Sequence, residues 1–229
     1  MSQQPAPVRS WRIDPRHALI AAALCWAGFA IVTVFVLQGM SGHFDAAGLR
    51  FWRSEPDWRP RGPAILSEMV RDVTALGGVL LRNVFALAAV TALLFLRLGR
   101  EALLLAATVA VGWGVGSLLK TIVARPRPDI VPHLMEVSGH SFPSGHSFNA
   151  AVAYIAIALA FAAMSPRRAV RWTIIASAVV LSLLIALSRV WLGVHYPTDV
   201  LAGCLGGAGW AFLASALLYR PAKAAAQAV

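Results

Sequence analysis

The chain has 229 residues, of which 59% are hydrophobic, and its mean hydropathy is +0.69. This composition excludes an ordinary soluble domain, because such a domain needs more polar residues to cover its surface. A formal net charge of +10 would suit a nucleic-acid-binding protein, but the basic residues are scattered between apolar runs and form no basic face or tail. The sequence therefore predicts a membrane protein that binds no nucleic acid.

Six stretches are long and apolar enough to cross a bilayer, which takes about 20 residues of helix. The first follows basic residues as a signal peptide does, but it is long for one and lacks a clear cleavage site, so we expect a retained helix. The second carries Arg82 and Asn83 near one end, and we expect Arg82 to reach the lipid headgroups. The stretches are 19–37, 79–96, 103–119, 148–164, 172–188 and 200–219.

A short amphipathic helix is expected in the long segment 39–78, between the first two spans. Pro63 can start it, and Trp52 and Trp58 suit a membrane interface. Apolar residues then recur at helical spacing, which predicts a helix that lies along the interface with Glu68, Arg71 and Asp72 facing water: Ile65, Leu66, Met69, Val70, Val73 and Leu76. The predicted fold class is all-α, a polytopic membrane protein with six transmembrane helices and this short interfacial helix.

Lys and Arg in the short loops predict the orientation, since they accumulate on the cytoplasmic side. They fall at four places on one side of a six-helix topology: Arg9, Arg12 and Arg16; Arg97 and Arg100; Arg167, Arg168 and Arg171; Arg220 and Lys223. Both termini are therefore expected in the cytoplasm, as segments 1–17 and 220–229 around a membrane domain 18–219. Residues 39–78, 120–147 and 189–199 are expected outside.

Glycines spaced four residues apart occur in two of the predicted spans, at Gly112 and Gly116 and at Gly203 and Gly207. This spacing lets helix backbones approach closely. Packing within the bundle explains it, and dimerisation through either face is the alternative.

Polar residues gather at the outer ends of four predicted helices. Three cations, two histidines and a carboxylate are brought to one membrane face, together with a helix start: Lys120, Arg127, Ser144, Gly145, His146, Arg189, His195 and Asp199. Arg offers bidentate donors to a phosphoryl group and Lys a compact charge. The helix start at 144–146 adds free N–H groups and the positive end of the helix dipole. The pattern indicates a phosphate site.

Two histidines at separate helix ends allow one to attack phosphorus while the other protonates the departing oxygen. Asp199 lies four residues after His195, so a helix starting near His195 would place its carboxylate beside the imidazole and fix its tautomer. Spacing alone leaves open which histidine attacks.

At this point the residues resemble a known family. Lys120 with Arg127-Pro128, then the run Pro143-Ser144-Gly145-His146, then Ser188-Arg189 with His195 and Asp199, are similar to the three signature motifs of the type 2 phosphatidic acid phosphatase superfamily. The run Asp72-Val73-Thr74-Ala75-Leu76-Gly77 also looks like one found before the second helix of bacterial members.

The resemblance implies a six-helix membrane fold, no metal or other cofactor, and a phosphohistidine intermediate. It makes His195 the nucleophile, Asp199 its orienting partner and His146 the acid for the leaving group. Lys120, Arg127 and Arg189 would bind the phosphoryl oxygens, with Ser144 and Gly145 completing the cradle. We leave Arg125 out of the core site, and expect His133 and His140 near its mouth.

The leading hypothesis is hydrolysis of a lipid phosphate or lipid diphosphate at the outer face of a bacterial inner membrane. A lipid phosphotransferase would use the same intermediate, and a transporter or lipid-phosphate binder would use the cations alone. Binding alone does not require both histidines, and the six apolar spans disfavour a soluble haloperoxidase with a related site. Phosphatidic acid, phosphatidylglycerol phosphate, undecaprenyl diphosphate and a lipid A phosphate all fit, and the sequence specifies neither the lipid nor the oligomeric state.

Overall fold

The structure is a computed structural model that describes residues 13–227, with side chains through residue 217. The expected cytoplasmic anchors Arg9 and Arg12, and the side chains of Arg220 and Lys223, lie outside that part.

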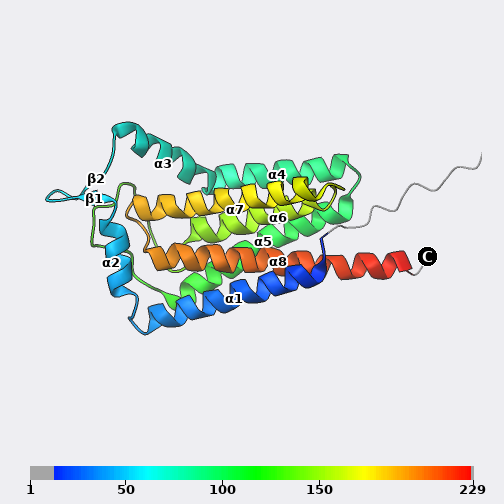
Figure 1. Cartoon of the computed structure of the whole chain (residues 1–229), viewed down its shortest axis with the longest axis horizontal. Coiled ribbons are helices and arrows are strands. Elements are labelled where there is room, and N and C mark those ends of the chain that lie inside the picture. Colours follow the sequence, from blue (N-terminus) through cyan, green and yellow to red (C-terminus); the bar gives the residue numbers. More distant parts are fainter. Residues whose placement is uncertain (1–12, 228–229) are drawn as a thin grey trace, which may run out of the picture.

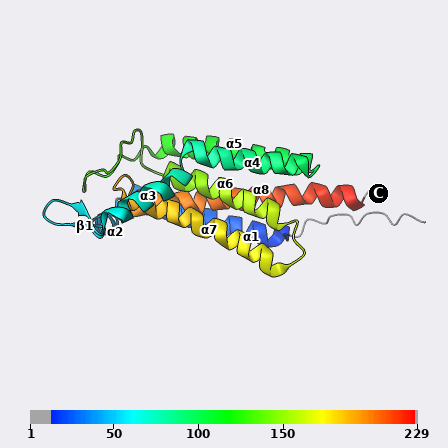
Figure 2. The same cartoon turned by 90° about the horizontal axis from the view of Figure 1, so that it is seen from above.

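Eight helices and one short hairpin make up the described residues, and the long helices run side by side along the molecule (Figure 1). Figure 2 shows α4 and α5 together on one side of the bundle. In chain order the elements are α1 (Pro15–Leu37), α2 (Gly42–Arg50), β1 (Arg53–Ser54), β2 (Arg59–Pro60), α3 (Ala64–Leu76), α4 (Val79–Phe95), α5 (Gly99–Val123), α6 (Gly145–Ala162), α7 (Arg168–Trp191) and α8 (Pro197–Gln227). The antiparallel hairpin pairs Arg53 with Pro60 and Ser54 with Arg59.

The predicted membrane fold is confirmed. Five helices are long and apolar enough to span a bilayer, and α3 with α4 passes the same test only as a pair bent by 50°. Large apolar side chains cover the outer surface, among them Phe95, 86% exposed, and Leu80, 74% exposed. Such a surface is stable only against lipid or another apolar partner. The chain is an integral membrane protein.

Helix α6 forms the centre of the bundle. In its most apolar window 72% of the residues are buried, against 11% in α1, and α5, α7 and α8 all pack on it. Small residues make this possible, because α6 presents alanine on nearly every side (Ala150, Ala151, Ala153, Ala156, Ala158, Ala160). Its first turn is therefore held by the neighbouring helices, and this turn carries Gly145 and His146.

The glycine pairs face into the bundle. A Cβ atom at Gly116 would press on the ring of Phe148, and one at Gly207 would overlap the carbonyl oxygen of Phe148 and the Cβ of Ala151. Gly112 and Gly203 are likewise packed against α6. Close packing between helices of one chain thus accounts for both pairs.

Gly207→Ala is expected to destabilise the bundle, by about 1–3 kcal/mol, because the added methyl has no room between α8 and α6. Gly114→Ala is the matched control, since nothing lies within 4 Å of a Cβ placed there. That variant should gain up to about 1 kcal/mol from its higher helix propensity. Thermal unfolding in detergent compares the two; equal unfolding midpoints would contradict the packing of α8 on α6.

The segment between the first two spans holds more structure than expected. The predicted amphipathic helix is present as α3, which begins directly after Pro63, with Glu68, Arg71 and Asp72 exposed as expected. Helix α2 and the hairpin were not expected, because their short sequences show no clear periodicity. Both lie at the same end of the bundle as α3 (Figure 1).

One further expectation was wrong. Arg82 does not reach outward to lipid headgroups, because it is only 5% exposed and lies on the buried stripe of α4 with Ala86, Ala89 and Leu93. The last predicted span, 200–219, lies within α8, which continues to Gln227.

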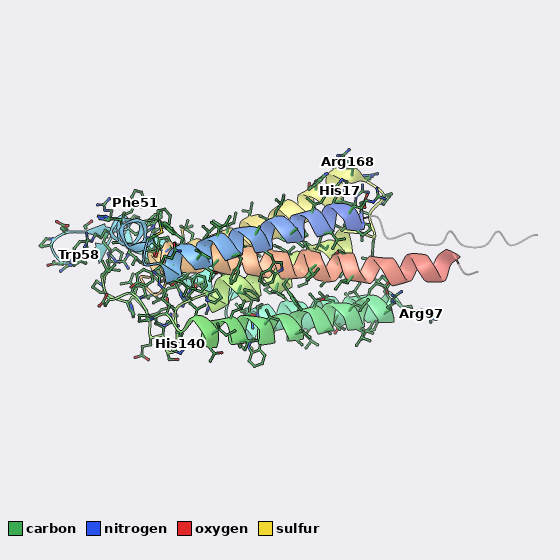
Figure 3. The ribbon with its side chains drawn as sticks, turned by 90° about the horizontal axis from the view of Figure 1, so that it is seen from below. His17, Phe51, Trp58, Arg97, His140 and Arg168 are labelled. Atoms are coloured by element: carbon green, nitrogen blue, oxygen red, sulfur yellow. The ribbon has the colours of Figure 1, made fainter. Side chains whose placement is uncertain are left out.

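The two ends of the bundle carry different residues. His17, Arg97 and Arg168 lie at one end, and Phe51, Trp58 and His140 at the other (Figure 3). The turns between α4 and α5 and between α6 and α7 are therefore on the side opposite α2 and the hairpin.

Candidate functional site

The ends of α5 and α7 and the starts of α6 and α8 meet at the end of the bundle that carries α2. Helix α5 stops at Ala124, whose left-handed φ of 49° turns the chain out of the helix. The loop that follows is held by two backbone bonds, from Ser141 N to Arg125 O at 2.8 Å and from Leu134 N to Leu192 O at 3.0 Å. Gly193, with φ 77°, then reverses the chain after α7 and brings His195 into the site.

His195 is buried, with 2% of its surface exposed, and both ring nitrogens have partners. Arg127 Nη1 lies 3.2 Å from Nε2, and Ser141 Oγ lies 3.1 Å from Nδ1. A guanidinium can only donate, so Nε2 is the accepting nitrogen and Nδ1 carries the proton. The lone pair of Nε2 therefore points towards the cationic side of the site.

Burial lowers the pKa of His195 to about 4; Asp199 opposes this shift, and Arg189 and Arg127 add to it. The imidazole is consequently neutral at ordinary pH, and its Nε2 is unprotonated.

Asp199 is fully buried and uses both carboxylate oxygens. Oδ1 accepts from Arg125 at 2.8 Å, and Oδ2 accepts from Ser141 Oγ and, at 2.9 Å, from Tyr196 N. Because α8 begins at Pro197, Asp199 is its third residue and the bond to Tyr196 N is the reciprocal half of a capping box. One carboxylate thus caps the helix and faces the histidine.

The contact between Asp199 and His195 is mediated by Ser141. Nδ1 lies 3.5 Å from Asp199 Oδ2, whereas Ser141 Oγ is within bonding distance of both groups. The sequence places Asp199 beside His195 but gives no signal for Ser141, which reaches them through the fold of the loop 124–144.

The predicted phosphate ligands surround this pair. Arg127 also donates to the carbonyl oxygens of Ser138, Gly139 and Val194, at 2.7, 3.0 and 2.9 Å. Lys120 Nζ donates to His140 O at 2.6 Å. These carbonyls fix the cations in place without neutralising their charge.

Arg189 is 2% exposed and is held differently. Its Nη1 donates to Thr74 Oγ1 of α3 at 3.0 Å, while its Nε has no hydrogen-bond partner. A buried guanidinium with an unused donor is suited to bind an anion. The contact with Thr74 makes α3 part of the site wall.

The start of α6 supplies the remaining predicted residues. A Cβ at Gly145 would meet only Lys120 Cε, at 3.7 Å, so the backbone there has open space before it. Ser144 is fully buried; its N–H donates to Asp199 O at 3.0 Å and its hydroxyl accepts from Ser147 at 3.0 Å.

His146 lies against the junction of α3 and α4. A Cβ at Gly77 would come within 3.3 Å of His146 Cδ2. His146 directly follows Gly145, whose backbone lies beside Lys120. The structure therefore brings all eight predicted site residues to one end of the bundle.

Arg125 is placed among carboxylates, away from the predicted phosphate ligands. It donates to Asp199 Oδ1 and Asp45 Oδ2, both at 2.8 Å, and to Thr198 Oγ1 at 2.9 Å, and it stacks over Tyr196 with 4.0 Å to the ring centroid. Burial alone would lower the pKa of Arg125, but the two carboxylates raise it, so the side chain stays charged.

Asp45, like Ser141, is a residue that sequence reasoning missed. It lies on α2, is 1% exposed, and also accepts from Thr198 N at 3.0 Å and from the Thr198 hydroxyl. No motif marks it. The only signal is a single Asp in an otherwise weakly polar segment, which does not reveal a partner 80 residues away.

His133 and His140 are exposed. His133 Nε2 lies 2.7 Å from Pro128 O, within its own loop, whereas His140 borders the site through the carbonyl that binds Lys120.

Comparison with known proteins gives several partial sequence relatives from bacteria. Phosphatidylglycerophosphatase B of Bacillus subtilis is 44% identical over 92 residues, covering 39% of this chain and 44% of that protein. Lipid A 1-phosphatase of Rhizobium etli is 33% identical over 121 residues, covering 49% and 47%. Undecaprenyl-diphosphatase BcrC of Bacillus subtilis is 31% identical over 97 residues, covering 39% and 44%. The aligned region spans about half the length of these relatives.

A solved structure similar to this chain matches nearly the whole fold. The crystal structure of a transmembrane PAP2-type phosphatidylglycerolphosphate phosphatase from Bacillus subtilis has a TM-score of 0.73 and 26% identity, covering 91% of this chain and 96% of that one. The model of the PAP2 superfamily matches residues 101–222, which is more than half of the chain and contains every predicted site residue. This chain belongs to the PAP2 superfamily.

Proposed function

We propose that the protein hydrolyses a phosphorylated lipid through a phosphohistidine on His195. The observation that carries this proposal is the state of the imidazole: it is neutral, Nδ1 donates towards Ser141, and the lone pair of Nε2 points at Arg127. The names of the related proteins, which are phosphatases of membrane lipids, support it.

The reaction has two steps. Nε2 of His195 attacks phosphorus, the bond from phosphorus to the lipid oxygen breaks, and His146 gives its proton to that oxygen. Water then attacks the phosphohistidine and gives a proton to His146, and the bond from nitrogen to phosphorus breaks to release phosphate. Lys120, Arg127 and Arg189 bind the phosphoryl oxygens, with the N–H groups at Gly145 and the Ser144 hydroxyl on the same side.

Arg125 has a positioning role in this mechanism. Its Nη1 donates to Thr198 and Asp199 and its Nη2 to Ser41 and Asp45, so all four terminal N–H groups are used and none is left for a phosphate. It holds Asp199, which through Ser141 holds the proton on Nδ1 of His195. Asp45 completes this chain of contacts and makes α2 part of the active-site scaffold.

The site faces the extracytoplasmic side in this proposal. Arg97 and Arg168 lie at the end of the bundle opposite His140, and the turns that carry them are rich in arginine (Figure 3). Basic loops of this kind stay in the cytoplasm. Both termini are then cytoplasmic, and a lipid reaches the site with its tails in the bilayer.

A panel of lipid phosphates in detergent micelles tests the function. Purified protein should release inorganic phosphate from at least one of phosphatidic acid, phosphatidylglycerol phosphate, a polyprenyl diphosphate and a lipid A phosphate. Labelled substrate separates the alternatives: a newly phosphorylated lipid in place of free phosphate would identify a phosphotransferase. Binding without turnover of any substrate would contradict the enzymatic proposal.

A further inference from the structure

Arg82 is a buried cation that the mechanism above does not use. It lies on α4 and is 5% exposed, and among the described residues its guanidinium bonds only to the neutral amide oxygen of its neighbour Asn83, at 3.3 and 3.4 Å. None of the ion pairs among residues 13–217 includes it. A charge inside a membrane protein is costly without a partner and so marks a candidate functional site.

Contacts of α6 with the end of α3 and with α4 place Arg82 next to the catalytic end. Gly77 lies against His146, Tyr154 Oη donates to Leu76 O at 2.6 Å, and the Phe85 and Tyr154 rings are 6.2 Å apart. The first turns of α4 therefore follow α6 from His146 to Tyr154. Helical side chains lean towards the helix start, and α4 starts two residues after Gly77, so the side chain of Arg82 leans towards the end of the bundle that carries His146.

The depth of Arg82 in the membrane indicates which part of a bound lipid it can contact. Arg82 is five residues beyond Gly77, about 7 Å further into the bundle at about 1.5 Å per residue. A lipid whose terminal phosphate binds Arg127 and Arg189 must pass this depth on the way to its tails. His146, the proposed acid for the leaving group, lies between the depth of the phosphate ligands and the depth of Arg82. The part of the lipid that lies beside Arg82 therefore belongs to the leaving group.

We infer that Arg82 binds a second phosphate, carried by the leaving group. The favoured substrates are then lipids with two phosphates in series, either a diphosphate or a phosphorylated glycerophosphodiester. Phosphatidic acid lacks the second anion. This inference rests on the proposed function, and it makes Arg82 the residue that selects among its substrates.

The test compares wild type, Arg82→Gln and Arg82→Lys on a polyprenyl diphosphate, phosphatidylglycerol phosphate and phosphatidic acid. Loss of one charged contact is expected to lower kcat/KM for the two-phosphate lipids about 10- to 100-fold more than for phosphatidic acid. Arg82→Lys should recover most of that preference. The product polyprenyl phosphate keeps the second phosphate, so it should also inhibit Arg82→Gln more weakly than wild type.

Two further variants keep the result interpretable. Arg82→Met removes the charge but keeps the length of the side chain in an apolar setting, so it should fold even if Arg82→Gln does not. Arg71→Gln, at an exposed arginine on α3, is the matched control and should change no substrate ratio. An equal loss on all three lipids, or no loss on any, would overturn the role of Arg82. Absence of turnover in wild type would instead count against the proposed function.

Discussion

Replacing His195 with alanine is expected to lower phosphate release by about 10⁴-fold or more, because the covalent route has no other nucleophile in its place. The variant should still fold, since the space left by the ring is small and Ser141 can still donate to Asp199. Release of phosphate from a purified lipid substrate measures the loss. Quenching in alkaline detergent, after incubation with lipid labelled in its terminal phosphate, should trap label on wild-type protein and none on the variant, because a phosphohistidine is stable to base but not to acid.

His17→Ala is the matched control for this experiment. His17 is exposed and lies at the opposite end of the bundle from His140 (Figure 3), so its loss should leave the rate unchanged. A His195→Ala protein that retains turnover within tenfold of wild type would remove His195 as the nucleophile. The phosphohistidine mechanism would fall with it.

Replacing Arg125 with glutamine is expected to lower kcat about 100-fold with little change in the affinity for vanadate or inorganic phosphate. The reason is that Arg125 binds Asp199 and Asp45 in place of substrate, so its loss disturbs the His195 tautomer and leaves the phosphate ligands intact. Breaking a buried ion pair also costs stability, roughly 3 kcal/mol, which thermal unfolding will show. Arg125→Lys should recover part of kcat, because it keeps the charge but not the two-pronged geometry.

The pH profile distinguishes a positioning role from a purely structural one. Asp199 raises the pKa of His195 above the value that burial alone would give, and Arg125 partly neutralises Asp199. Without Arg125 the pKa of His195 should rise, and the acid limb of kcat should move to higher pH because His195 must be neutral to attack. Asp45→Asn should give a smaller shift in the opposite direction, because Arg125 then neutralises Asp199 more fully. Weaker vanadate binding with an unshifted profile would instead make Arg125 a phosphate ligand.

Much of the fold follows from local sequence properties. Long uncharged runs specify spanning helices because a bilayer offers no hydrogen bonds to an unfolded backbone, and this identifies α1, α5, α6, α7 and α8 directly. Ser144 as the cap residue before α6 is equally local. The position of Arg82 could not be predicted in this way, since a cation near a helix end can turn outward to lipid headgroups or inward to the bundle. The packing of α4 on α5 and α6 determines which of these two directions the side chain takes.

The residues of the site also fall into two groups, those that the sequence predicts and those that only tertiary contacts place. The sequence by itself determined that Lys120, Arg127, His146, Arg189, His195 and Asp199 occur at helix ends on one side of the bundle, because alternating spans fix the side of every loop. Only the tertiary structure decided that Ser141 lies between His195 and Asp199, and that Arg125 binds Asp199 and Asp45. Hydrogen bonds depend on distances of about 3 Å between residues far apart in the chain, and no periodicity or spacing in the sequence encodes those distances.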